Sequence, residues 1–130
     1  MSVAGLMLIL NKERLILGVS RKNNSNSFGL PGGESKPGED PMQCAIRKTR
    51  EETSVEVTRC VQIFRRNEFT KERGQFFAYC FYALEWSNKP KTTEQGIVKW
   101  ITEEELTGSN VVFADYNSKI LQVFKMFDRK

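Results

Sequence analysis

The chain has 130 residues, of which 39% are hydrophobic and 28% are charged, and its formal net charge is +4. This composition is typical of a single globular domain, here residues 1–130, and argues against a disordered chain. The sequence has no histidine, which excludes Ser-His and Cys-His nucleophilic catalysis, and its three irregularly spaced cysteines favour neither a disulfide framework nor a zinc site. Catalysis would therefore depend on carboxylates, lysine, tyrosine or a metal bound by oxygen ligands.

The N-terminal segment Met1–Leu10 is apolar but has no basic region and no small-residue cleavage pattern. It predicts a buried strand at Val3–Leu10 rather than a signal peptide, and a cytoplasmic protein without a membrane partner is expected. Arg14–Ser20 is predicted to be the antiparallel hairpin partner of this strand. The polar segment Arg21–Ser27 is predicted to be a loop.

A glycine-rich turn and a capped helix are expected next. Phe28–Leu30 predicts a short strand that leads into a turn at Pro31–Gly33. Asp40 is a favoured N-cap residue, proline is favoured at the first helical position, and Gln43 is placed to complete a capping box. The helix is expected to end near Thr53–Ser54.

The second half of the chain predicts further strands and a last helix. The expected elements are strands at Val55–Phe64, Gln75–Trp86 and Gly96–Ile101, a capped turn at Thr102–Leu106 and a helix at Asp115–Arg129. Arg65–Gly74 is expected to be a charged connection between the first two of these strands. The order of elements indicates an α+β fold, a mixed sandwich.

Carboxylates gather around the first predicted helix. Positions 48, 51 and 52 share one helix face, so Glu51 and Glu52 point the same way, and Glu39 lies one loop upstream. Carboxylates and a nearby glycine backbone suit Mg²⁺, which shares its coordination sphere with substrate phosphates. The alternative is a solvated face stabilised by Lys48–Glu52 and Arg47–Glu51 ion pairs.

This stretch resembles the Nudix box, G-x5-E-x7-R-E-U-x-E-E-x-G-U, in which U is a bulky aliphatic residue. The positions that match are Gly33, Glu39, Arg47, Glu51, Glu52 and Val55. The sequence LPGG before the box, and VKWI and EEEL after it, are also similar to the family, so the resemblance covers essentially the whole chain.

The resemblance implies a Nudix α/β/α sandwich with a mixed β-sheet. It also implies hydrolysis of a pyrophosphate bond in a nucleoside triphosphate or another nucleoside diphosphate linked to a group X. The implied cofactor is Mg²⁺, with Mn²⁺ as an alternative. Glu51 and Glu52 would be metal ligands, assisted by the Gly33 carbonyl, and together with Lys48 and Arg47 they would be the catalytic residues. Glu39 and Arg47 would form the ion pair that joins loop to helix.

Three residues depart from the family pattern: Thr49, Ser54 and Lys48. Thr49 replaces an aliphatic residue, and Ser54 replaces the glycine expected in a left-handed conformation after the helix. Lys48 replaces a glutamate that binds metal or prepares the water, and it could pair with Glu52 or neutralise substrate phosphate. The expectation is a slowed or altered hydrolase; the alternative is an inactive domain that binds a nucleotide as a sensor or interaction module.

Residues outside the box are also candidates. Glu94 is the first candidate for an additional metal ligand, ahead of Glu103–Glu105. By its likeness to oxidised-guanine nucleotide diphosphatases, the segment Phe113–Asn117 suggests base recognition by Phe113 and Asn117; the alternative is that Asp115 or Asn117 caps the last helix. Several basic side chains could steer phosphates, although a solvated strand end is favoured for them: Arg65, Arg66, Lys71 and Arg73. The expected partner is a small-molecule nucleotide, and nothing in the sequence indicates a nucleic acid or a particular oligomeric state.

Overall fold

The computed structural model describes residues 2–21, 24–108 and 113–128. The elements in chain order are β1 (Ser2–Leu8), β2 (Ile16–Arg21), β3 (Asn24–Gly29), β4 (Gly32–Glu34), α1 (Pro41–Thr53), β5 (Glu56–Thr70), β6 (Gly74–Ser87), β7 (Val98–Ile101), α2 (Glu103–Thr107) and α3 (Ala114–Asp128). Within these residues, no helix combines the length and the apolar character that crossing a bilayer would need.

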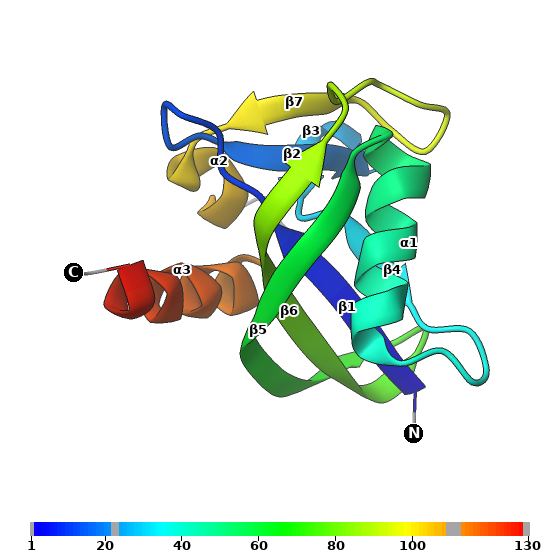
Figure 1. Ribbon diagram of the computed structural model, residues 1–130. Helices are drawn as coiled ribbons and strands as arrows, with labels where there is room; N and C mark the ends of the chain where they lie inside the picture. The colour runs from blue at the N-terminus through cyan, green and yellow to red at the C-terminus, as the bar shows by residue number, and fades with distance from the viewer. Residues whose placement is uncertain (1, 22–23, 109–112, 129–130) are drawn as a thin grey trace.

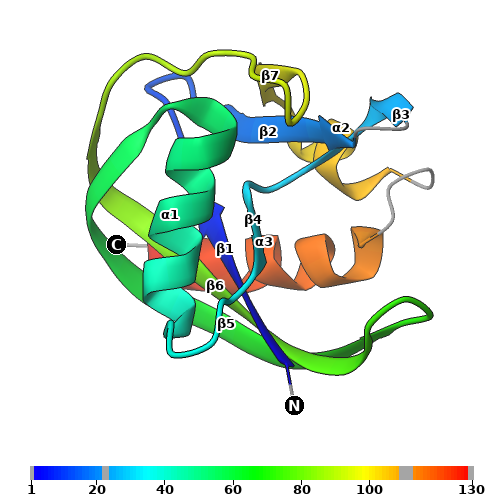
Figure 2. The same cartoon turned by 90° about the vertical axis from the view of Figure 1, so that its right-hand side faces the viewer.

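The strands form two sheets, and the helices lie outside them (Figures 1 and 2). The four-stranded sheet has the order β4-β1-β6-β5, and the three-stranded sheet has the order β3-β2-β7. The first sheet is mixed, because β1 is parallel to β6 but antiparallel to β4, and β5 is antiparallel to β6. The expected α+β fold with a mixed sheet is therefore confirmed.

Each face of the four-stranded sheet buries its own apolar cluster. Along β1, Ala4 and Leu8 pack with Ile120 and Phe124 of α3, whereas Met7 packs with Ala45 of α1. This division follows from the two-residue period of a strand, which sends successive side chains to opposite faces. A continuous apolar run such as β1 can thus be buried on both faces.

Helix α1 begins and ends as its terminal residues predict. The Asp40 carboxylate accepts a hydrogen bond from the Gln43 N–H at 2.8 Å, and the Gln43 side chain accepts one from the Asp40 N–H at 3.0 Å. Ser54, at the C-cap, adopts a left-handed conformation with φ 70°. Serine therefore takes the conformation for which the family pattern has glycine.

Four predictions about the strands were wrong. Strands β1 and β2 do not form a hairpin: they belong to different sheets, and only local contacts such as the bridge between Leu10 and Ile16 join them. The predicted loop at Arg21–Ser27 becomes strand from Asn24 onward, and the last two residues of the predicted turn at Pro31–Gly33 already belong to β4. The charged connection Arg65–Gly74 is mostly strand, because β5 continues to Thr70. Local composition did not predict these pairings, because each depends on a partner strand elsewhere in the chain.

Thr49 is a buried polar residue whose replacement is expected to stabilise the fold. It has no exposed surface, and its hydroxyl has no hydrogen-bond partner in the described part of the chain. Because an unpaired buried hydroxyl costs free energy, Thr49→Val should raise the free energy of unfolding by about 1 kcal/mol. Urea unfolding would measure the change.

Thr53 offers a matched control on the same helix. It is equally buried, but its hydroxyl donates to the Thr49 carbonyl at 2.6 Å and accepts from the Val55 N–H at 3.1 Å. Thr53→Val should therefore lower the free energy of unfolding by about 1 kcal/mol. Equal effects of the two substitutions would contradict this account.

Candidate functional site

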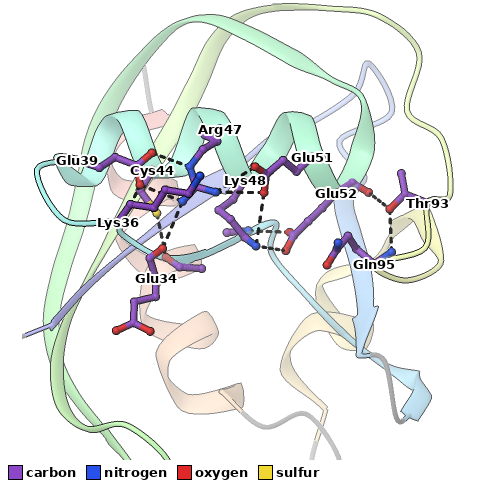
Figure 3. Close-up of polar contacts among 12 residues, drawn as sticks. Glu34, Lys36, Glu39, Cys44, Arg47, Lys48, Glu51, Glu52, Thr93 and Gln95 are labelled. Carbon is purple, nitrogen blue, oxygen red and sulfur yellow. Dashed lines mark hydrogen bonds and ion pairs between the residues drawn. The ribbon is translucent and has the colours of Figure 1, made fainter.

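An ion-pair network joins the loop before α1 to the exposed face of that helix (Figure 3). The Arg47 Nε and Nη2 atoms donate to the two Glu39 carboxylate oxygens at 2.6 and 2.9 Å. Arg47 Nη1 donates to both Glu51 oxygens at 3.1 Å. The ion pair between Glu39 and Arg47 that the family resemblance implies is therefore present, and Arg47 also connects it to Glu51.

The Glu39 carboxylate is strongly stabilised in its charged form. The hydrogen bonds from Arg47, with a further one from the Lys36 N–H at 2.9 Å, lower the pKa of Glu39 to about 2. Since this pKa lies below the ordinary carboxyl value, the interaction stabilises the folded state above about pH 4.5. That stabilisation is lost as the pH falls from there towards 2.

The pH dependence of the free energy of unfolding should therefore differ between the parent and Glu39→Gln. In urea unfolding between pH 5 and about pH 2, the parent is expected to lose more stability than Glu39→Gln, which has no proton to gain at this position. Glu56→Gln serves as a control, because Glu56 is a partly exposed carboxylate that pairs with Arg50 at 3.5 Å. Parallel pH profiles for the parent and Glu39→Gln would show that this pair does not contribute to acid unfolding.

Lys48 lies between the two carboxylates that were expected to bind metal. Its Nζ atom is 3.8 Å from Glu51 Oε1 and 3.7 Å from Glu52 Oε2. The ion pair with Glu52 that was predicted from the four-residue spacing is therefore present. Three carboxylates (Glu39, Glu51, Glu52) and two cations (Arg47, Lys48) give this network a net charge of −1.

Glu52 is the more buried of the two carboxylates. Its side chain is 13% exposed, against 42% for Glu51. Burial raises the pKa of Glu52, opposed by the hydrogen bond that Oε1 accepts from the Gly32 N–H at 3.0 Å and by the Lys48 charge. The Gly33 carbonyl accepts a hydrogen bond from the Cys44 thiol at 3.1 Å.

A cavity of about 490 Å³ opens beside Glu52. Helix α1 contributes Glu52 to its wall, β4 contributes Gly32 and Gly33, and the start of α3 contributes Tyr116 and Asn117. The residues that line the cavity also include Arg21, Phe28, Glu68, Arg73, Phe76, Gln95 and Phe113. The volume is in the range of small-molecule binding sites, and the wall combines aromatic rings with a few charged groups.

Asn117 and Phe113, the two residues suggested for base recognition, both line this cavity. Asn117 is buried, and its Nδ2 atom donates to the Leu106 carbonyl at 3.0 Å, which fixes the orientation of the carboxamide. The alternative, a helix cap, was wrong: both Asp115 and Asn117 lie inside α3, and Asp115 pairs with Arg66 at 3.0 Å. Recognition of a base by Asn117 and Phe113 remains a prediction.

Glu94 is not joined to the two box carboxylates by a hydrogen bond or ion pair. It is exposed in the turn between Thr93 and Gly96, and it is not among the residues that line the cavity. The same turn does reach the end of α1, because the Thr93 hydroxyl donates to the Glu52 carbonyl at 3.1 Å (Figure 3). Gln95, rather than Glu94, lines the cavity, and the role of Glu94 as a metal ligand stays a prediction.

Sequence reasoning missed or underrated several charged residues of the cavity. Arg73 was expected at a solvated strand end, but it lines the cavity and its guanidinium stacks on Phe76, with its Cζ atom 3.9 Å from the ring centroid. Glu68 lines the same wall and pairs with Arg66. The only signal in the sequence was the Arg73-Gly74 pair, which is compatible with a tight turn between two strands.

The oxygen donors of the network fit a divalent cation only in part. Mg²⁺ is typically bound by one or two carboxylates together with substrate phosphates, and Glu51 and Glu52 supply that number of carboxylates. Within the described part of the chain, no three acidic, cysteine or histidine side chains cluster in a way that could hold a metal by themselves. The donor set therefore fits a cation that arrives with phosphates, while the Lys48 charge opposes its binding.

The comparisons with known proteins agree with this fold. The family model described as "NUDIX domain" matches residues 1–124. A protein of Bacillus subtilis (strain 168) named "Putative 8-oxo-dGTP diphosphatase" is 28% identical over 102 residues, which cover 77% of this chain and 66% of the relative's length. The chain thus spans slightly less than two thirds of that relative.

Two solved structures are similar to this chain in fold. A MutT protein from Methanosarcina mazei Go1 superimposes with a TM-score of 0.78 at 20% identity, covering 98% of this chain and 96% of its own. A MutT NUDIX hydrolase from Burkholderia pseudomallei has a TM-score of 0.76 at 19% identity, covering 93% of this chain and 95% of its own.

Proposed function

Because the chain belongs to the NUDIX domain family, whose members are generally hydrolases, we propose that it cleaves a pyrophosphate bond in a nucleoside triphosphate or another nucleoside diphosphate linked to a group X. One observation carries the proposal: Glu52 of the box lies on the wall of a cavity large enough for a nucleotide. A binding site for the nucleoside and a carboxylate suited to the phosphate chemistry are thus parts of one cavity.

The cavity residues suggest how a nucleotide would be held. Phe113, which is only partly buried, offers aromatic surface for a base at the cavity wall. Asn117 is anchored through its Nδ2 atom, so its Oδ1 atom would accept a hydrogen bond from the base edge. Arg21 and Arg73 line the same cavity and would attract the phosphates.

Glu51 and Glu52, with the Gly33 carbonyl, would hold Mg²⁺, or Mn²⁺ in its place. When bound, such an ion offsets the phosphate charge and lowers the pKa of a bound water. Arg47 would keep Glu51 in position through its two hydrogen bonds, and Glu39 would hold Arg47. Glu94 would complete the ligand set only after a rearrangement of its turn.

Lys48 is expected to weaken turnover by opposing the cation. Two like charges about 4 Å apart repel by about 4 kcal/mol at an effective dielectric constant near 20. This position favours a second candidate function, a domain that binds a nucleotide without cleaving it, because Lys48 contacts both carboxylates.

Turnover by the parent and by Lys48→Glu distinguishes the two functions. The proteins would be incubated with Mg²⁺ or Mn²⁺ and a panel of nucleotides that includes 8-oxo-dGTP, and released phosphate and pyrophosphate would be measured. We expect slow turnover by the parent and at least about a tenfold gain for Lys48→Glu, which removes the repulsion. Lys12→Glu, an exposed site after β1, makes the same charge change as a control.

The outcomes distinguish hydrolysis from nucleotide binding without cleavage. If neither the parent nor Lys48→Glu releases product, hydrolysis of this panel is refuted. If only Lys48→Glu turns over, hydrolysis of this panel by the parent is refuted and the second candidate function is favoured.

A further inference from the structure

The ammonium group of Lys48 is held in place by its surroundings. Besides the contacts with Glu51 and Glu52, its aliphatic part lies directly over Gly33: a Cβ atom built on Gly33 would be 2.8 Å from Lys48 Cε. The lysine side chain is 22% exposed. A glycine at position 33 is therefore what allows Lys48 to lie along β4 and reach both carboxylates.

This position changes the charge that the cavity presents to an anion. Glu52 lines the cavity, and an unpaired carboxylate there would repel the phosphates of a nucleotide. Lys48 Nζ lies 3.7 Å from Glu52 Oε2, and its positive charge offsets the charge of that carboxylate. In the usual arrangement of such a site, a divalent cation beside the carboxylates would provide the same compensation.

Arg73 adds a second positive charge, with unused donors. Among the residues that the structure describes, its buried Nε and Nη2 atoms have no hydrogen-bond partner, and the nearest carboxylate contact is 3.9 Å, from Nη2 to Glu34 Oε2. Buried donors without acceptors cost free energy, which a ligand with several acceptor oxygens would recover. A phosphate group is such a ligand, and Arg73 lines the same cavity as Glu52.

We infer that Lys48 and Arg73 provide the positive charge that a divalent cation would otherwise supply, so that a nucleoside triphosphate binds in this cavity without added metal. The inference rests on the proposed function in one respect, namely that the cavity binds a nucleotide. It does not require that the nucleotide be cleaved. Lys48 is assigned a positioning role, because it acts through Glu51 and Glu52.

Calorimetric titration in EDTA and in Mg²⁺ tests the inference. The probes are inorganic tripolyphosphate and the nucleotide of the panel that binds best. For the parent, we expect dissociation constants that agree within about threefold between the two conditions, since the chain's own cations compensate the charge. For Lys48→Met, binding in EDTA should weaken by about tenfold or more, and Mg²⁺ should restore part of the loss.

Two further variants make the test specific. Arg73→Gln should weaken binding in both conditions, because it removes donors that face the ligand, whereas Lys12→Met should change neither. Circular dichroism would establish that each variant is folded. Electron paramagnetic resonance of Mn²⁺ without nucleotide provides a second measurement: Lys48→Glu should bind the ion at least about tenfold more tightly than the parent.

Binding by the parent that requires Mg²⁺, or a Lys48→Met variant that binds as the parent does in EDTA, would overturn the inference while leaving the hydrolase proposal intact. Equal Mn²⁺ affinities for the parent and Lys48→Glu would also overturn it. If neither probe binds to any variant in either condition, both this inference and the proposed function fail. Metal-independent binding without turnover would support the inference and refute hydrolysis.

Discussion

Replacing Gly5 by alanine is expected to lower the free energy of unfolding by about 3 kcal/mol, because the added methyl group has no space. A Cβ atom at Gly5 would lie 2.2 Å from the Pro41 carbonyl oxygen and 2.9 Å from the Ala45 nitrogen. Both atoms belong to the backbone of α1, so no side-chain rotation relieves the clash. Helix α1 would have to move away from β1, and the apolar contact between Met7 and Ala45 would loosen.

Gly29→Ala is the matched control for this prediction. Gly29 also lies in a strand, but a Cβ atom there would meet no atom of the described residues within 4 Å. Its replacement should change the free energy of unfolding by less than about 0.5 kcal/mol. Chemical unfolding of the two variants measures the difference, and a Gly5→Ala variant as stable as Gly29→Ala would show that α1 is not held against β1 by this close approach.

The features predictable from the sequence are those set by residues close together in the chain. The two capping boxes, Asp40 with Gln43 and Thr102 with Glu105, form because each needs only one helical turn. The contact of Lys48 with Glu52 follows from four-residue spacing on a helix. Such interactions depend little on the rest of the fold.

The strand pairings depend on partners that are distant in sequence, and they were harder to predict. Strand β1 pairs with β6, whose residues lie more than 70 positions later, as in the pair Ser2–Phe76. The hairpin was predicted because the apolar segment of β2 follows β1 closely in the sequence. Strand β1 is instead buried on both faces and lies between β4 and β6. The tertiary context therefore overrode the local signal.

The cavity was only partly predictable for the same reason. Asn117 and Phe113 were suggested by a family resemblance, whereas Glu68 and Arg73 reach the wall because β5 and β6 form a long hairpin. The sequence around Glu68 and Arg73 has the composition of any charged strand end. Only the three-dimensional arrangement distinguishes Arg73 from a solvated arginine: two of its nitrogens are buried without a hydrogen-bond partner among the described residues.

If the proposed metal site is correct, Glu52→Gln is expected to reduce turnover by at least about a hundredfold, because it would remove a charged ligand from that site while keeping the shape of the side chain. The amide oxygen of glutamine would still accept the hydrogen bond that Glu52 Oε1 now accepts from the Gly32 N–H at 3.0 Å. Pyrophosphate release at saturating Mg²⁺ measures the effect. Glu56→Gln, just beyond the helix, is the matched control and should retain full turnover.

Stability distinguishes a lost catalytic group from a disrupted fold. Burial raises the pKa of Glu52, so the folded state binds a proton there more tightly than the unfolded chain does, and the ionised group costs stability as the pH rises through its folded pKa. The neutral amide avoids that cost, which leads us to expect a Glu52→Gln variant at least as stable as the parent at pH 7. A stable variant that keeps full turnover would remove Glu52 from the metal site, whereas one that unfolds early would show that its ion pair with Lys48 contributes more than its burial costs.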